Sequence, residues 1–346
     1  MKEQLAALIT VLLLLCLFSP ALAGQSPALH VDGNLLKTDK GAAVRLQGVN
    51  VAGMEWSNNG EGRTLQSVRI AIEDWHANAI RLPLAQDRWF GFAQGQTDGG
   101  ASYRALVDSV VNYASGKGCY VIIDLHWSDM GKWGKNIGQH KMPDENSALF
   151  WKDAAKRFAN NSAVIFDIYN EPHDVTWETW KNGGVVTEKN DKGDETYRSP
   201  GMQKLVDTVR ETGARNVIAA GGLDWAFDLI GVINGYALTD PKGSGIIYST
   251  HIYPWKGGIE RWDSKVTVAA GKYPILIGEV GCQPDPKQED PAIWAPKVLA
   301  YIEKHRFNWT AWCFHPSASP CMLKDWSYAP TLYWGRPVKQ ALTGNQ

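Results

Sequence analysis

Short apolar runs alternate along this chain with segments in which apolar residues recur every three or four positions. The runs are apolar at nearly every position, which is typical of strands buried on both faces of a sheet. Eight such runs occur, at residues 44–50, 79–84, 120–125, 164–170, 216–220, 246–251, 275–280 and 310–314. Helix-like segments between them include residues 102–117, 148–160, 201–212 and 291–305.

Strands that are each followed by a helix imply parallel βα units, and eight such units close a barrel. The predicted fold is therefore α/β, a single-domain (β/α)8 TIM barrel over residues 24–346. A doubly wound open sheet would show the same alternation, but no Gly-rich nucleotide-binding turn follows the first run. Residues 29–35 and the turn at Lys40-Gly41 predict an N-terminal β-hairpin that caps the barrel bottom. The polar, Gly-rich residues 177–200 predict a loop at the cleft rim, whose charged half only connects.

The first 23 residues have the pattern of a secretory signal peptide. Lys2 precedes an apolar run at residues 5–18, and Ala21-Leu22-Ala23 supplies small residues before a cleavage site at Gly24. The alternative is a membrane anchor, but the run is shorter than the roughly 20 residues that a spanning helix needs. We therefore expect a secreted, extracellular protein with no membrane partner.

The balance of charges limits the kinds of molecule that this protein can bind, and the cysteines can be divided into thiols and a disulfide. The 35 Lys and Arg balance 36 Asp and Glu without any basic run, so we expect a neutral substrate and no nucleic acid. We expect a monomer. Four cysteines follow the signal peptide: Cys119, Cys282, Cys313 and Cys321. Cys119 enters a strand-like run and is expected to be a buried thiol, whereas the other three are expected to form one disulfide.

Tryptophan is unusually abundant, with 16 residues in the chain. About half of them are expected to fill gaps between the barrel and its helices, since Trp is usually mostly buried. The others would present flat apolar faces near the surface, each with one hydrogen-bond donor. Such faces suit a pyranose ring edged by hydroxyl groups.

Catalytic groups of this barrel type sit at the carboxyl ends of the strands, so polar residues that end the apolar runs are the candidates. Two of them are glutamates, Glu171 after the fourth run and Glu279 in the seventh. A carboxylate buried there is unfavourable without a task or a partner. Pairing with Arg81 is the structural alternative for either glutamate alone, but two such residues favour catalysis. The other strand-end candidates are Arg81, His126, Asn170, His251, Tyr253 and Trp312.

A pair of carboxyl groups suits glycoside hydrolysis. One protonates the leaving oxygen, and the other attacks the anomeric carbon, with the two about 5–5.5 Å apart in retaining enzymes. We expect the charge of the nucleophile to raise the pKa of the acid.

Five motifs in the chain, taken in order, resemble glycoside hydrolase family 5. They are Ile80-Arg81-Leu82-Pro83, Asp124-Leu125-His126-Trp127, Tyr169-Asn170-Glu171-Pro172, His251-Ile252-Tyr253-Pro254 and Ile277-Gly278-Glu279-Val280-Gly281. Val280 stands where Phe is frequent in that family, and residues 313–326 form an unfamiliar extension of the eighth loop. The resemblance implies a retaining glycosidase on the predicted barrel.

The resemblance also implies roles for individual residues. Glu171 matches the acid/base, Glu279 the nucleophile, and Asn170 the residue that binds the sugar 2-hydroxyl. Arg81 and Tyr253 would surround the nucleophile, His126 and His251 would position substrate and the glutamates, and Trp312 would be the aromatic platform, with Trp309 as its alternative. Possible subsite aromatics are Trp56, Trp127, Trp133, Trp177, Trp180, Trp225 and Trp255.

The favoured function is a secreted, endo-acting β-1,4-glucanase whose substrate is cellulose or another β-glucan. A β-mannanase would share the catalytic residues, and the sequence leaves this alternative open. Two other classes remain, a non-catalytic glycan-binding barrel and a metal-dependent hydrolase on the same fold. No His-x-His or His-Glu-x-x-His spacing is present, so we expect no metal and no cofactor.

Overall fold

Eight parallel strands close into a barrel in this computed structural model, which describes residues 26–190 and 193–344. Neighbouring strands follow the chain order around the ring, and β13 closes it by pairing with β4. Every predicted apolar run overlaps a barrel strand, so the predicted TIM barrel is confirmed. The strands are β4 (Gln47–Asn50), β5 (Ala79–Ala85), β6 (Tyr120–Trp127), β7 (Val164–Asp167), β10 (Ile218–Gly221), β11 (Ile246–Ile252), β12 (Ile275–Val280) and β13 (Asn308–Ala311).

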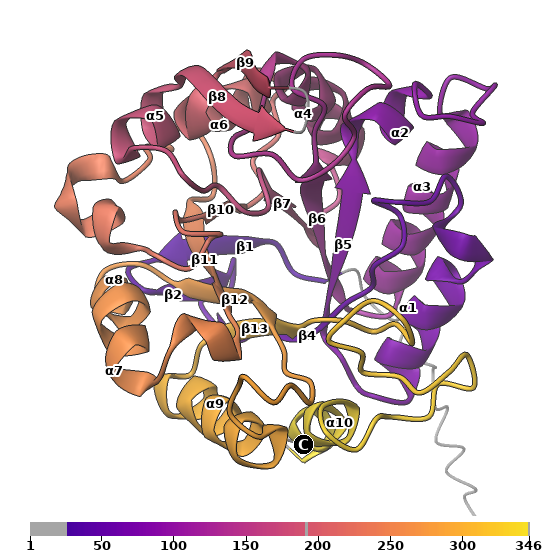
Figure 1. Ribbon diagram of the computed structural model, residues 1–346, viewed down its shortest axis with the longest axis vertical. Helices are drawn as coiled ribbons and strands as arrows, with labels where there is room; N and C mark the ends of the chain where they lie inside the picture. Colours follow the sequence, from indigo (N-terminus) through magenta and orange to yellow (C-terminus); the bar gives the residue numbers. More distant parts are fainter. Residues whose placement is uncertain (1–25, 191–192, 345–346) are drawn as a thin grey trace, which may run out of the picture.

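Helices surround the ring of strands (Figure 1). The longer ones are α1 (Thr64–Glu73), α3 (Ala101–Gly116), α4 (Glu145–Phe158), α6 (Gly201–Glu211), α9 (Pro291–His305) and α10 (Gly335–Thr343). Short helical segments are α2 (Gln86–Phe90), α5 (Trp177–Asn182), α7 (Ile259–Trp262), α8 (Val268–Ala270), η1 (Gly60–Gly62), η2 (Val232–Tyr236), η3 (Pro254–Lys256) and η4 (Asp263–Thr267). The fifth strand, β10, is followed only by the short η2, so the regular alternation of strand and helix is interrupted there.

A small antiparallel sheet covers one end of the barrel. It consists of β1 (Leu29–Asp32), β2 (Leu35–Thr38) and β3 (Ala43–Val44), and Figure 1 shows β1 and β2 lying across the ring. Leu29 and Leu36 from this sheet join the inward side chains Ile122, Ile165 and Leu276 in one buried cluster. The predicted N-terminal cap is confirmed, and it seals the end opposite the strand carboxyl termini.

The segment predicted as a loop at residues 177–200 is ordered into regular structure, and that prediction is wrong. After α5, strands β8 (Gly184–Asn190) and β9 (Gly193–Ser199) form an antiparallel hairpin. Its charged half is more than a connection, because Glu188 accepts hydrogen bonds from the Lys141 backbone and the Tyr197 hydroxyl. Alternating inward and outward side chains, rather than composition, make it a hairpin.

The prediction for the tryptophans is confirmed, whereas the prediction of a disulfide among the cysteines is wrong. Eight of the 16 Trp side chains are less than 2% exposed, so about half do pack in the interior: Trp75, Trp89, Trp151, Trp180, Trp262, Trp294, Trp309 and Trp334. Cys119, Cys282, Cys313 and Cys321 are all free thiols. The predicted disulfide among the last three is therefore wrong in this structure; Cys282 and Cys313 are buried, and Cys282 lies against the Tyr333 carbonyl.

The predicted signal peptide, residues 1–23, lies outside the described residues. Within the ranges that the structure does describe, each helix is too short or too polar to cross a membrane.

The cap gives a first prediction about stability. Leu36 is 1% exposed in the bottom cluster, whereas its neighbour Leu35 is 46% exposed. Leu36→Ala should lower the free energy of unfolding by about 2–5 kcal/mol, because it leaves a cavity under the barrel. Leu35→Ala should change it by less than about 0.5 kcal/mol. Urea denaturation measures both, and equal losses would show that the cap contributes nothing specific.

Candidate active site

The carboxyl ends of the barrel strands bring the predicted site residues together. Arg81 lies in β5, His126 in β6, His251 in β11 and Glu279 in β12. Asn170 and Glu171 follow β7, Tyr253 follows β11 directly, and Trp312 follows β13 directly. Residues that are far apart in sequence therefore meet at one end of the barrel, opposite the N-terminal cap.

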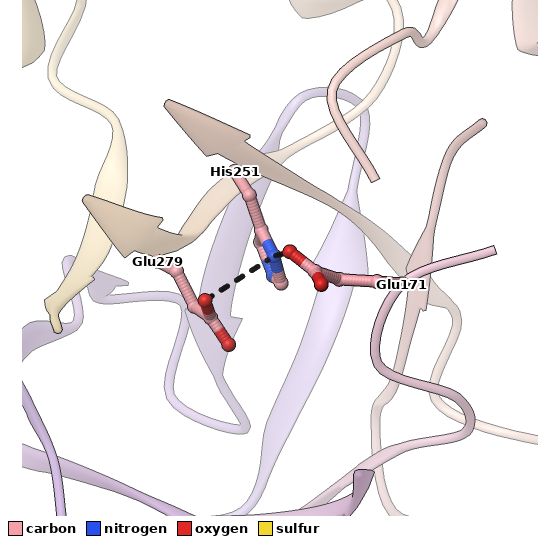
Figure 2. A group of neighbouring side chains, drawn as sticks. All are labelled: Glu171, His251 and Glu279. Atoms are coloured by element: carbon pink, nitrogen blue, oxygen red, sulfur yellow. Dashed lines mark hydrogen bonds and ion pairs between the residues drawn. The ribbon is translucent and has the colours of Figure 1, made fainter. Parts of the chain in front are cut away.

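Glu171 and Glu279 face each other across His251 (Figure 2). One carboxyl oxygen of each glutamate and one ring nitrogen of His251 all lie within 4.8 Å of one another. His251 Nδ1 is 2.8 Å from Glu171 Oε1 and 3.6 Å from Glu279 Oε2. The two carboxyl groups are thus at the short separation typical of retaining glycosidases and not the 6.5–9.5 Å typical of inverting ones.

A β-bulge where β12 pairs with β11 aims His251 at this pair. Thr250 is in register with Ile277, but the next residue, His251, is in register with Glu279, so β12 has one extra residue at Gly278. Such irregularities re-aim side chains beside active sites. Gly278 also leaves space, since a Cβ there would lie 2.5 Å from Ser249 Oγ and 3.0 Å from His251 Nε2.

Arg81 is fully buried and binds the groups around it through all three of its guanidinium nitrogens. Nη1 donates to Glu279 Oε1 at 2.8 Å and to Asn50 Oδ1 at 3.0 Å. Nη2 donates to Asn170 Oδ1 at 2.7 Å. Nε donates to Asp167 Oδ2 at 2.9 Å, and Nη2 also lies 3.1 Å from Asp124 Oδ1. One cation therefore forms ion pairs with three buried carboxyl groups.

Tyr253 completes the surroundings of Glu279. Its hydroxyl donates to Glu279 Oε2 at 2.7 Å, so both oxygens of this carboxylate have a donor. Burial and the nearby Glu279 charge raise the pKa of Tyr253, which keeps the hydroxyl protonated. These two donors fix the orientation of the Glu279 carboxyl group, as an attacking group requires.

Glu171 has a different environment. Its side chain is 17% exposed, and its carboxyl contact is His251, whose own pKa is lowered by burial to about 3. Burial raises the pKa of Glu171 to about 7, against the opposing charges of Arg81 and Lys256. The sequence-based expectation named the charge of Glu279 as the cause, and this is wrong: burial is the largest cause.

The Asn170 side-chain amide is held by a hydrogen-bond donor on one side and an acceptor on the other. Its Oδ1 accepts from Arg81, and its Nδ2 donates to Gln139 Oε1 at 2.9 Å. Nδ2 also lies 3.4 Å from His126 Nε2. His126 in turn places Nδ1 2.6 Å from Asp124 Oδ2, and burial lowers the pKa of His126 to about 4. The Asn170 amide is therefore fixed in orientation.

Two aromatic surfaces border the glutamates. Trp312 is 9% exposed, stacks on His126 at 5.3 Å, and shares an apolar cluster with Tyr253 and the half-buried Trp56. Trp309 is 1% exposed in the main core, so it is Trp312 that lies at the site. Trp255 is 55% exposed and stacks on Tyr253 at 4.5 Å with the rings nearly parallel.

The other subsite candidates lie in different settings. Trp225 is 40% exposed and stacks on His173, two residues beyond Glu171. Trp133 stacks on Phe92, and Trp127 is the last residue of β6 and half-buried. The structure does not bring Trp177 or Trp180 to the site. Trp177 packs against the main core, and Trp180 is fully buried with its ring nitrogen bound to the Gly221 carbonyl.

Several site residues were not predicted. Asp124 and Asp167 could have been found, because each is a charged residue inside an apolar strand-like run. Glu55 is a further buried carboxyl group beyond β4 that accepts from the Gly53 backbone amide, and burial raises its pKa to about 8. Glu55 and Gln139 lie in loops, where no periodic pattern marked them.

Glu171, His251 and Glu279 are the one group of His, Cys, Asp and Glu in the described ranges whose ligand atoms lie near enough to share a metal ion. Their present contacts suit a different task. Both oxygens of Glu279 already accept hydrogen bonds, and the cationic Arg81 beside them would repel a divalent ion. The donor set therefore fits a pair of reacting carboxyl groups better than a metal centre.

Comparison with known proteins agrees with this geometry. The model of the family described as Cellulase (glycosyl hydrolase family 5) matches residues 38–318. Endoglucanase MaCel5A of Microbulbifer sp. (strain ALW1) is 23% identical over 291 residues, which are 82% of this chain and 50% of that protein. Manganese dependent endoglucanase Eg5A of Phanerodontia chrysosporium is 30% identical over 230 residues, which are 62% of this chain and 54% of that protein. The chain thus spans about half the length of these curated relatives.

The fold has a solved counterpart over nearly its whole length. The β-glucanase SdGluc5_26A from Saccharophagus degradans, in complex with cellotetraose, superimposes with a TM-score of 0.75 at 24% identity. The match covers 92% of this chain and 94% of that one, which agrees with the closed barrel seen here.

Arg81 gives a second prediction. Arg81→Met should lower the free energy of unfolding by about 3–5 kcal/mol, because it leaves buried carboxylates without their cation. Burial raises the pKa of Asp124 and of Asp167 to about 7 in the folded protein. Groups with a raised folded pKa lose stability as the pH rises through that value. The charge of Arg81 lowers both pKa values, so they should rise further without it, and the loss in the variant should be larger at pH 8 than at pH 5.

Urea denaturation at the two pH values measures this difference. Arg198→Met is the matched control, because the Arg198 side chain is 71% exposed, and it should stay within about 0.5 kcal/mol of the original protein. A loss for Arg81→Met that does not depend on pH would contradict the electrostatic explanation.

Proposed function

This chain belongs to glycosyl hydrolase family 5, and on that premise we propose that it is an endo-acting β-1,4-glucanase that hydrolyses β-glucan with retention of anomeric configuration. One observation carries the proposal. Two glutamates lie with carboxyl oxygens within 4.8 Å, one surrounded by donors and the other in a largely buried position. This asymmetry supports Glu279 as nucleophile and Glu171 as acid/base.

The first step of the proposed reaction forms an ester. A carboxylate oxygen of Glu279 attacks the anomeric carbon, the glycosidic C–O bond breaks, and Glu171 gives its proton to the departing oxygen. Arg81 and Tyr253 orient the attacking carboxylate. Burial keeps Glu171 protonated near neutral pH, so the acid is ready before the substrate binds.

The second step reverses these roles. Glu171, now ionised, takes a proton from a water molecule whose oxygen attacks the anomeric carbon. The ester bond breaks, Glu279 returns to its ionised form, and the sugar leaves with its original configuration. The Asn170 amide, fixed by Arg81 and Gln139, is oriented for the hydroxyl beside the reacting carbon.

The substrate class rests on the relatives and on the aromatic surfaces. The relatives are named endoglucanases, and the solved β-glucanase holds cellotetraose. In this chain Trp312, Trp56 and Trp255 offer flat apolar faces around the glutamates, which suit pyranose rings. A β-mannanase would use the same carboxyl pair, and it remains the second candidate.

We also propose that the protein is secreted and acts outside the cell as a monomer. The pattern of Lys2, the apolar run and Ala21-Leu22-Ala23 supports export. A polymeric glucan is too large to be taken up, so an extracellular location agrees with the proposed substrate.

A substrate panel tests the function. Reducing-sugar release should be fastest on carboxymethyl cellulose or mixed-linkage β-glucan and much slower on mannan, xyloglucan and xylan. Glu279→Gln should lower kcat at least about 10³-fold while the protein remains folded, because the amide has no charge with which to attack. EDTA should leave the rate unchanged.

Each contrary result in the panel has a distinct meaning. Preference for mannan would replace the glucanase by the mannanase. Binding of glucan without turnover by the original protein would indicate a glycan-binding barrel. Loss of activity in EDTA, restored by a divalent metal, would indicate a metal-dependent hydrolase.

The acid/base gives a prediction about pH. Since the pKa of Glu171 is raised to about 7, the protonated form needed in the first step persists to neutral pH and is lost above it. For cellotetraose, kcat/KM should therefore fall about tenfold per pH unit above pH 7. An aryl cellobioside with a strongly acidic phenol needs little proton donation, so its alkaline fall should be weaker. If kcat/KM falls equally above pH 7 for both substrates, a group other than Glu171 causes the fall.

A further inference from the structure

We infer that Gln139, whose neighbours His140 and Lys141 are bound by Glu188 of the β8–β9 hairpin, is a positioning residue that fixes the Asn170 amide for the reaction. The inference rests on the proposed function. Gln139 lies in the loop between β6 and α4, and its side chain is half-buried. It contacts none of the predicted catalytic carboxyl groups and would act through Asn170.

The contacts of Gln139 determine which way the Asn170 amide faces. Gln139 Oε1 accepts from Asn170 Nδ2 at 2.9 Å, while Arg81 donates to Asn170 Oδ1 at 2.7 Å. An acceptor on the nitrogen and a donor on the oxygen together exclude the flipped amide. Gln139 Nε2 donates to the backbone carbonyls of Glu171 at 3.1 Å and His140 at 2.9 Å, so its own amide is fixed as well.

The segment that carries Gln139 is held by one carboxylate of the hairpin. Glu188 Oε1 accepts from the Lys141 backbone amide at 2.7 Å and from the Tyr197 hydroxyl at 3.1 Å. Glu188 Oε2 lies 2.9 Å from His140 Nδ1. These contacts bind residues 140 and 141, directly beyond Gln139, to β8.

His140 makes this clamp an ion pair. Its Nδ1 faces a carboxylate, and its Nε2 lies 2.6 Å from the Asn136 backbone carbonyl, so both nitrogens must donate and the ring is a cation. Burial lowers the pKa of His140, but the hydrogen bonds to Glu188 and Asn136 outweigh it and raise the value overall. The ring is buried, so the pair is little weakened by solvent.

A double-mutant cycle tests whether Gln139 acts through Asn170. With cellotetraose as substrate, Gln139→Leu should lower kcat about 10- to 100-fold with KM within threefold, since small misplacements at a reacting centre have effects of this size. Asn170→Ala should lower kcat further. The double variant should be no slower than Asn170→Ala, because residues that act through one group are not additive. Additive losses would overturn the inference.

The hairpin is tested with a matched pair of substitutions. Glu188→Gln removes the charge from the clamp and should lower kcat in the same direction as Gln139→Leu. Arg198→Gln changes an exposed charge in the same hairpin and should leave kcat unchanged. Equal effects of the two variants would show that the hairpin has no specific positioning role.

A crystal structure of the Gln139→Leu variant separates this inference from the proposed function. The Asn170 amide should be displaced or rotated while Glu171 and Glu279 stay in place. An unmoved amide would overturn the positioning role, whatever the activity. If the original protein hydrolyses no β-glucan, the proposed function fails, whereas a displaced amide would still support the positioning contact.

Discussion

The buried guanidinium of Arg81 is the interaction on which the site depends. Three carboxyl groups, Asp124, Asp167 and Glu279, point at this one cation inside the barrel, where water cannot solvate them. Placing charges there is unfavourable unless each finds a partner. Because Arg81 also binds Asn50 and Asn170, it joins β4, β5, β6, β7 and β12 at their carboxyl ends. Stability and catalytic geometry are therefore set by the same side chain.

Chemically similar glutamates acquire different surroundings because their neighbours differ. Glu279 receives hydrogen bonds from Arg81 and Tyr253, one at each carboxyl oxygen. Glu171 lies beside His251, which burial keeps neutral, and burial raises the Glu171 pKa. The two roles are thus established before substrate binds, by the fixed surroundings of each carboxyl group. The reaction then needs little rearrangement of the protein, which is the advantage of a preorganised site.

The barrel and its main site residues could be predicted because buried parallel strands leave long apolar runs, and a polar residue at the end of such a run is conspicuous. Glu171 and Glu279 follow that rule, and Arg81 is conspicuous as a charged residue inside such a run. The β8–β9 hairpin was missed because its polar composition resembles a loop. Gln139 and Glu55 were missed because irregular segments have no periodicity. The free cysteines and the burial of Trp180 depend on side-chain packing between distant segments, which no local pattern records.

The bulge between β11 and β12 has a consequence for how this barrel can vary. His251 faces the glutamates only because Gly278 is the one extra residue between two otherwise matched strands. A change of side chain within either strand alters packing locally. A change of length by a single residue would turn His251 or Glu279 to the opposite face of the sheet. Away from His251, Gly278 and Glu279, these strands should therefore tolerate substitution better than insertion or deletion, and new substrate preferences are expected to arise in the loops that follow them.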